Sequence, residues 1–159
     1  MRVEIDKQSG FCGGVIRAIG TAERFLGEHG GRLYSLGAIV HNEEELARLN
    51  SLGLETVSVA DLPSLSSPAE KKTLLIRAHG EPPAVYQQVS ALGFDLIDCT
   101  CPVVLGLQKQ IREAYARLNA AGGRVIIYGK DGHPEVLGLV NSGVVLTGGG
   151  ALFPITQKI

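Results

Sequence analysis

Short apolar runs rich in β-branched residues alternate along this chain with longer segments of helical periodicity. The runs that the pattern predicts to be strands are 2–5, 32–36, 55–59, 73–77, 96–99 and 124–128. The segments that it predicts to be helices are 14–26, 43–52, 83–92, 102–121 and 135–140. Alternation of this kind gives mostly parallel sheets, because each helix carries the chain back to the edge where the next strand begins. The sequence therefore predicts an α/β fold with small, mostly parallel sheets flanked by helices.

The length of 159 residues fits one ordinary domain or two small ones, and 45% hydrophobic residues are enough for a packed core. We place a break near Cys101, which divides the chain into a first α/β domain over 1–100 and a second over 101–159. The Pro- and Ser-rich stretch 63–68 is predicted to be a surface loop. A formal net charge of −1 offers no basic surface, so we expect no nucleic-acid partner.

No apolar run has the length that crossing a membrane requires, so no membrane association is expected. The first residues alternate charged and apolar side chains, unlike a secretory signal, and this predicts a cytoplasmic location. Three cysteines, an odd number, argue against a disulfide framework. They leave metal binding, redox chemistry or simple burial.

Cysteines and histidines fall where a predicted strand gives way to a helix. Five residues occupy such positions: Cys12, His41, His79, Cys101 and His133. In α/β sheets this is the carboxyl edge, where ligands bind and where helix N-termini offer unpaired N–H groups to anions. The pattern therefore predicts a binding site for metal, phosphate or both at this edge.

Each of these residues taken singly has a simpler interpretation. A buried cysteine is usually a small hydrophobe, and a single histidine is usually structural, as we expect for His29 in its polar turn. A structural zinc site is disfavoured, because only Cys99 and Cys101 approach the local pairing of zinc ligands. Glu135 is either a proton donor beside His133 or a carboxylate favoured by the helix dipole.

Five segments resemble motifs of the 4-hydroxy-3-methylbut-2-enyl diphosphate reductase (LytB) family, in the family's order. They are Gly10-Phe11-Cys12-Gly13-Gly14-Val15, Val40-His41-Asn42, Ala78-His79-Gly80, Asp98-Cys99-Thr100-Cys101-Pro102 and Gly132-His133-Pro134-Glu135-Val136. The resemblance implies three small α/β domains in a pseudo-symmetric arrangement around a central pocket, of which this chain supplies the first one or two.

The resemblance also implies a 4Fe-4S cluster held by three cysteines. Cys12 and Cys101 match two of these ligands, and the third lies outside this chain. Cys99 stands where the family often has alanine, so it is interpreted as a packed neighbour.

The same resemblance implies the remaining roles. His41, His79 and His133 match residues that hold the diphosphate or relay protons, and Glu135 matches the proton donor. The implied reaction removes the hydroxyl of 4-hydroxy-3-methylbut-2-enyl diphosphate reductively, giving isopentenyl and dimethylallyl diphosphate in non-mevalonate isoprenoid biosynthesis. An electron donor such as ferredoxin or flavodoxin is implied as the protein partner.

Beyond Val140 the resemblance fades, and the segment 147–154 does not match the family's next strand and helix. This predicts a truncated or frame-altered gene product, or a deliberately shortened chain, that is inactive by itself. Two other classes stay open: a folded fragment without turnover, and a zinc-dependent hydrolase that uses the same cysteines and histidines.

Overall fold

A computed structural model describes residues 2–4, 9–67, 70–128, 134–140 and 154–155. Its helices are α1 (Gly13–His29), α2 (Glu43–Ser51), α3 (Leu62–Leu65), α4 (Pro83–Ala91), α5 (Pro102–Asn119) and α6 (Pro134–Val140), with the 3-10 helix η1 (Val59–Asp61). Its strands are β1 (Leu33–Leu36), β2 (Leu54–Val57), β3 (Thr73–Ile76), β4 (Asp95–Asp98), β5 (Ile127–Tyr128) and β6 (Pro154–Ile155).

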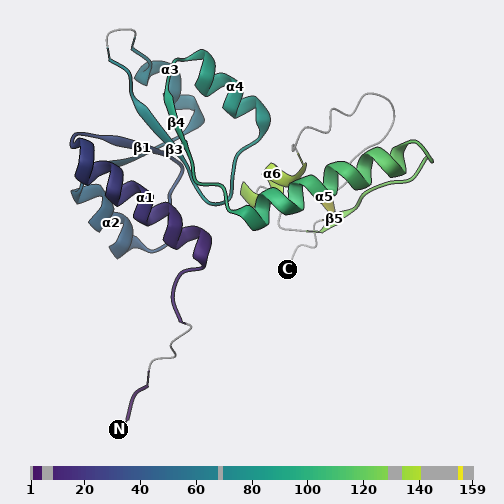
Figure 1. Cartoon of the computed structure of the whole chain (residues 1–159), viewed down its shortest axis with the longest axis horizontal. Helices are drawn as coiled ribbons and strands as arrows, with labels where there is room; N and C mark the ends of the chain where they lie inside the picture. The colour runs from purple at the N-terminus through teal and green to yellow at the C-terminus, as the bar shows by residue number, and fades with distance from the viewer. Residues whose placement is uncertain (1, 5–8, 68–69, 129–133, 141–153, 156–159) are drawn as a thin grey trace.

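Four strands form one parallel sheet in the order β2-β1-β3-β4. Helices α1 and α2 cover one face of this sheet, and α3 and α4 lie on the other (Figure 1). Because all four strands are parallel, their carboxyl ends meet at one edge. The mostly parallel α/β fold predicted from the sequence is confirmed.

Each face of the sheet has its own apolar core, because side chains alternate between the two faces along each strand. Leu33 and Leu75 point toward α1 and α2, where Ala18, Ala22 and Leu49 are fully buried. Tyr34, Leu36, Leu74 and Ile76 point the other way and pack with Leu62, Val89 and Phe94. All four residues of β1 are buried, including the polar Ser35, whose hydroxyl donates to the carbonyl of Gly37 at 2.8 Å.

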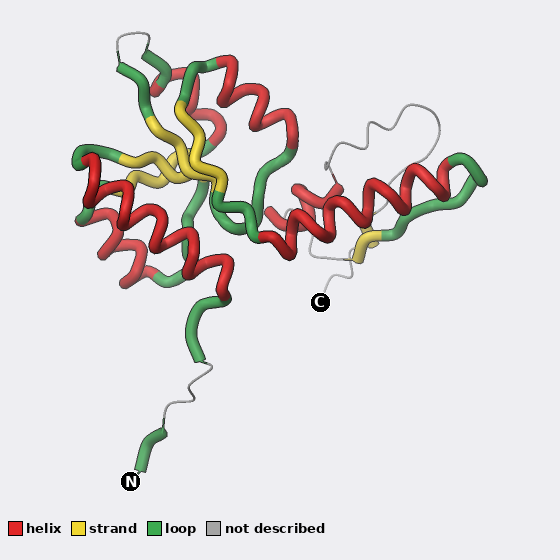
Figure 2. The backbone as a smooth tube through the Cα atoms, in the orientation of Figure 1, coloured by secondary structure: helices red, strands yellow, loops and turns green. Residues whose placement is uncertain are grey.

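Helix α5 leads away from the sheet and packs beside α6 (Figure 2). Pro102 stands in its first turn, where a missing N–H costs nothing, and Gly122 with φ 70° follows its end. The short strands β5 and β6 pair in parallel near this helix pair. Among the helices that the structure describes, none is long and apolar enough to cross a membrane.

Three sequence predictions need correction. Residues 2–4 form no strand and are exposed, and Ile5 lies outside the described residues. Part of the stretch predicted as a loop is helix α3, which carries Pro63 in its first turn and follows directly on η1. A capping box between Ser58 and Asp61 begins η1. The strand predicted over 124–128 is confined to β5, Ile127–Tyr128.

Candidate functional site

Two of the three cysteines occupy the N-cap positions of helices. Cys12 precedes α1 with φ −66° and ψ 158°, and Cys101 precedes α5 with φ −63° and ψ 134°. Neither side chain makes a capping hydrogen bond, and neither forms a disulfide. The first turn of a helix has unpaired N–H groups and the positive end of the helix dipole. Both cysteines therefore stand at the positive end of a helix.

The first turn of α1 packs directly against Cys101. Gly14 is buried, and a Cβ built on it would lie 3.0 Å from both Cβ and Sγ of Cys101 and 3.5 Å from Cβ of Ala78. A side chain at residue 14 would therefore displace Cys101. The absence of a side chain at Gly14 lets the two helix starts that carry Cys12 and Cys101 meet.

Cys99 belongs to the core and not to the surface. It is buried among residues of α1 and β3, and burial raises the pKa of its thiol. Its backbone N–H extends the β3–β4 ladder by donating to the carbonyl of Ile76 at 2.9 Å. This placement agrees with the interpretation of Cys99 as a packed neighbour.

The fold brings His41 and His79 together from the ends of two adjacent strands. Their ring centroids lie 6.1 Å apart with planes tilted by 38°. His41 is exposed and comes just before Asn42, whose side chain caps α2 by accepting from the N–H of Glu45 at 2.8 Å. His79 is half-buried in the loop after β3.

The His79 turn needs a glycine as its last residue. Gly80 donates its N–H to the carbonyl of Arg77 at 3.0 Å and has φ 70°. A Cβ there would lie 2.9 Å from Cγ2 of Thr100, so the turn also packs against the loop that carries Cys101. The cysteine and histidine loops are thus in contact.

Helix α6 carries Glu135 in its first turn, half-buried. A Cβ built on Gly138 would lie 3.7 Å from the carbonyl oxygen of His79 and 3.7 Å from Nε2 of Gln108. The helix therefore lies beside the His79 turn. His133 lies outside the described residues.

Sequence reasoning missed a buried ion pair that brackets His79. Nη2 of Arg77 lies 3.7 Å from Oε1 of Glu81, and the two side chains are only 12% and 13% exposed. Burial raises the pKa of the Glu81 carboxyl, and the nearby Arg77 opposes that rise. A Cβ on Gly37 would lie 2.7 Å from Cζ of Arg77, so the guanidinium fills the space beside that glycine. The sequence did contain a signal for this ion pair, because Arg77 and Glu81 carry opposite charges and flank His79.

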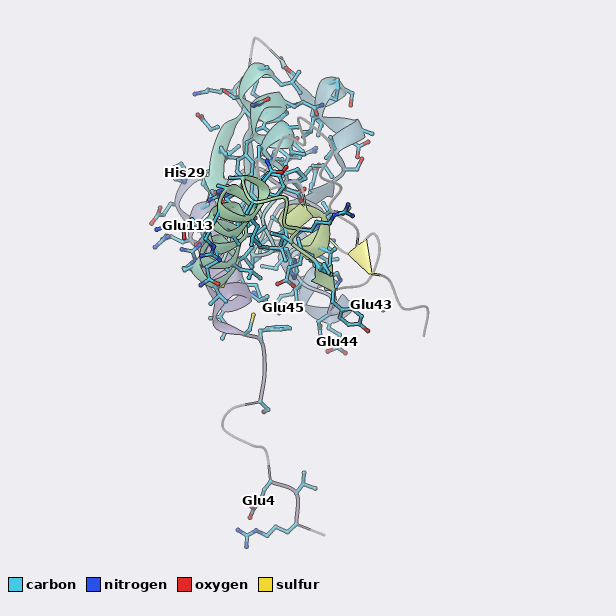
Figure 3. The ribbon with its side chains drawn as sticks, turned by 90° about the vertical axis from the view of Figure 1, so that its right-hand side faces the viewer. Glu4, His29, Glu43, Glu44, Glu45 and Glu113 are labelled. Atoms are coloured by element: carbon cyan, nitrogen blue, oxygen red, sulfur yellow. The ribbon has the colours of Figure 1, made fainter. Side chains whose placement is uncertain are left out.

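His29 has a structural role, as expected. Its Nδ1 lies 3.1 Å from the carbonyl oxygen of Phe25, and its ring stacks on Phe25 with centroids 4.5 Å apart. Figure 3 shows His29 well apart from Glu43, Glu44 and Glu45, which form the first turn of α2 directly after His41. His29 is therefore a suitable control residue for the histidines at the carboxyl edge.

Within the described ranges, no group of three or more His, Cys, Asp or Glu side chains is arranged to hold a metal ion. His41 and His79 approach each other from different loops, and Cys101 lies against Gly14 of α1.

We expect the three thiols to react with iodoacetamide at very different rates at a single pH. Cys12 should be alkylated fastest because it is exposed, and Cys101 more slowly because it is half-buried. Cys99 should be slowest by about tenfold or more, since its reaction requires opening of the core. Mass spectrometry of timed samples measures the three rates, and alkylation of Cys99 as fast as Cys12 would contradict the placement.

The fold and the site together define a class: an α/β protein whose cysteines and histidines gather at helix starts along the carboxyl edge of a parallel sheet. The family model described as LytB protein matches residues 3–149. This chain therefore belongs to the LytB protein family, as its motifs indicated.

Relatives with established names agree with this family. The chain is 49% identical over 138 residues to the 4-hydroxy-3-methylbut-2-enyl diphosphate reductase of Porphyromonas gingivalis, covering 87% of this chain and 46% of the relative. It is 50% identical over 140 residues to the reductase of that name from Parabacteroides distasonis, covering 88% and 47%. The chain thus spans about half the length of the curated relatives it matches.

Solved structures of the same kind of enzyme share the fold. A structure of (E)-4-hydroxy-3-methyl-but-2-enyl diphosphate reductase, described as the terminal enzyme of the non-mevalonate pathway, superposes with a TM-score of 0.63 at 36% identity. It matches over 86% of this chain and 45% of that one. The E-1-hydroxy-2-methyl-but-2-enyl-4-diphosphate reductase of Plasmodium falciparum gives 0.70 at 29%, over 86% and 40%.

Proposed function

We propose that this chain supplies the cysteine- and histidine-bearing half of a 4-hydroxy-3-methylbut-2-enyl diphosphate reductase. The observation that carries the proposal is the meeting of two cysteine-capped helix starts, α1 and α5, at Gly14. The chain shares 45 to 50% identity with enzymes of that name, which supports the same chemistry. The reaction would yield isopentenyl and dimethylallyl diphosphate for isoprenoid biosynthesis.

This chain has residues for two of the three cysteine ligands that a 4Fe-4S cluster would need. Cys12 and Cys101 would be two of its ligands, since each cysteine stands at a helix N-terminus, where unpaired N–H groups can donate to cluster sulfurs. The third cysteine would come from residues outside this chain. When bound, the cluster supplies single electrons and an iron that acts as a Lewis acid.

His41 and His79 would bind the diphosphate of the substrate, together with His133. The two described rings lie close enough for both to reach one anion. Imidazole can donate N–H to phosphate oxygens. The start of α2, directly after His41, adds unpaired N–H groups to this region, although its first turn is acidic.

Glu135 would deliver a proton to the leaving hydroxyl. Two electrons and two protons convert the carbon–oxygen bond of the allylic alcohol into a carbon–hydrogen bond and water. A half-buried carboxyl group on a helix beside the His79 turn is suited to hold one of these protons. The electrons would come from a small reduced protein such as ferredoxin or flavodoxin in the cytoplasm.

We propose that the boundary between two domains lies near Cys101. Residues 33–98 contain every strand of the four-stranded sheet, and α5 begins at Pro102 and leads away from it. The site would then lie where the first domain meets the second.

Anaerobic reconstitution with iron and sulfide tests the proposal. The suitable protein is a chimera of residues 1–140 and the complementary half of the Parabacteroides distasonis reductase, hereafter the chimera. A 4Fe-4S absorbance and paramagnetic resonance signal should form, be lost in Cys12→Ser and Cys101→Ser, and persist in the matched control Cys99→Ala. Binding of stoichiometric zinc in place of iron would favour the zinc-dependent hydrolase. Binding of no metal by the unaltered chimera would favour a folded fragment without turnover.

We expect His41→Ala or His79→Ala to weaken binding of inorganic pyrophosphate to the chimera about tenfold or more. Each change removes one hydrogen bond to a charged group, worth roughly 1.5 to 3 kcal/mol. Isothermal titration measures the affinity, and His29→Ala is the control because its ring is engaged with Phe25. Unchanged affinity in both variants would assign His41 and His79 a structural role instead.

A further inference from the structure

Thr100 is a buried polar residue between the three loops of the site. Its side chain is only 2% exposed, and it directly precedes Cys101. A buried hydroxyl is stable only where its hydrogen bonds are made, so the partners of Thr100 determine what it can hold in place.

The hydroxyl of Thr100 joins the Cys101 loop to α4. Oγ1 of Thr100 donates to Oδ1 of Asp98 at 2.5 Å, and the same carboxylate oxygen accepts the N–H of Thr100 at 2.8 Å. Because a hydroxyl has one hydrogen, a bond in the second contact of Oγ1, at 3.1 Å from the hydroxyl of Tyr86, requires Tyr86 to donate. Oδ2 of Asp98, at 3.4 Å, is a second and more distant acceptor for the same Tyr86 hydrogen. Burial raises the pKa of Tyr86, which keeps this donor protonated.

The rest of Thr100 contacts the other two loops. Its carbonyl accepts from Nη2 of Arg17 on α1 at 2.8 Å, one turn after the N-cap Cys12. Its Cγ2 lies 2.9 Å from the position that a Cβ on Gly80 would take, so the methyl group packs against the turn that carries His79. Cys101 itself is tied to that turn, because its N–H donates to the carbonyl of Ala78 at 2.9 Å.

We propose that Thr100 is a positioning residue that fixes Cys101 relative to the Cys12 helix and the His79 turn, and that its hydroxyl is the part that holds Cys101. The consequence for catalysis rests on the proposed function, in which Cys101 is a metal ligand. The positioning itself is a property of the metal-free chain and is measured there.

Two variants separate the hydroxyl from the methyl group of Thr100. Thr100→Val keeps the shape and removes the hydroxyl, so Asp98 loses one of its two bonds from Thr100 and Tyr86 keeps only its longer contact with Asp98, at 3.4 Å. Thr100→Ser keeps the hydroxyl and removes the methyl. Thr56→Val, at an exposed threonine of β2, is the matched control for the chemical change.

The readout is the rate of iodoacetamide alkylation of Cys101 in the metal-free 159-residue chain at one pH, followed by mass spectrometry. Thr100→Val should raise this rate about tenfold, because a lost buried hydrogen bond increases local opening by about that factor. Thr100→Ser and Thr56→Val should leave it within about twofold. Cys99, two residues away in the core, is the internal control and should keep its slow rate in every variant.

Three results would overturn the proposal. An equal rise for Cys99 and Cys101 would mean general loosening of the domain, and an unchanged Cys101 rate in Thr100→Val would mean that the hydroxyl holds nothing. An equal rise in Thr100→Ser would assign the effect to the methyl group.

If Thr100→Val does not fold by circular dichroism, Tyr86→Phe takes its place, with an expected rise of about threefold confined to Cys101. Loss of the cluster from the chimera would refute the proposed function without changing these rates.

Discussion

The change Glu135→Gln in the chimera is expected to lower turnover by about 10²- to 10⁴-fold, the usual contribution of a general acid. Glutamine keeps the shape and much of the hydrogen bonding of glutamate but has no proton to give at neutral pH. Substrate affinity should change little, because the histidines and helix termini would hold the diphosphate. Anaerobic assays with a chemical reductant measure turnover, and titration with substrate measures binding.

Glu113→Gln is the matched control for this prediction. Glu113 is an exposed carboxylate on α5, paired loosely with Lys109 at 3.8 Å, and Figure 3 shows it at the molecular surface. Its change alters the net charge by the same amount and should leave turnover intact. Turnover of Glu135→Gln within about threefold of the unaltered chimera would remove Glu135 from the chemistry, since no general-acid contribution is that small.

The hydrophobic pattern of the sequence predicted most of the helices and strands, because the residues that these elements bury recur with their own period. Strand β1 and helix α5 were both predicted, although β1 includes the polar Ser35 and α5 leaves Leu105 and Leu107 exposed. Helix α3 was missed because it is four residues long and contains Pro63 and Ser64, residue types that also suit a loop. Residues 2–4 alternate like a strand but pair with no strand among the described residues.

Sequence could predict which site residues lie close together where the order of the strands alone brings them together. His41 and His79 follow β1 and β3, and these strands are neighbours, so their rings meet. Thr100 and the Arg77–Glu81 pair were not predictable, because their importance lies in hydrogen bonds and contacts between segments distant in sequence. The contact of Gly14 with Cys101 was not predictable either, since glycine is common at turns and this contact exists only in the folded chain.

The second large effect concerns the 159-residue chain assayed without any other polypeptide, for which we expect no turnover above background. The first turns of α1 and α5, beside the two capping cysteines, expose large apolar side chains: Ile16 is 58% exposed and Val103 78%. Water therefore has free access to a region whose electrostatic interactions would be strongest when dry. The relatives contain about as many residues again, which would cover this surface and add ligands.

The test compares the chain alone with an equimolar mixture of the chain and the separately expressed complementary half of the Parabacteroides distasonis reductase, under an anaerobic reductant. Activity only in the mixture, lost again when the chain carries Glu135→Gln, would mean that the catalytic groups are competent and need a partner surface. The exposed apolar side chains should also make the isolated chain self-associate, so its sedimentation should depend on concentration until the partner half is added. Substantial product from the chain alone would show that residues outside it are dispensable for the reaction.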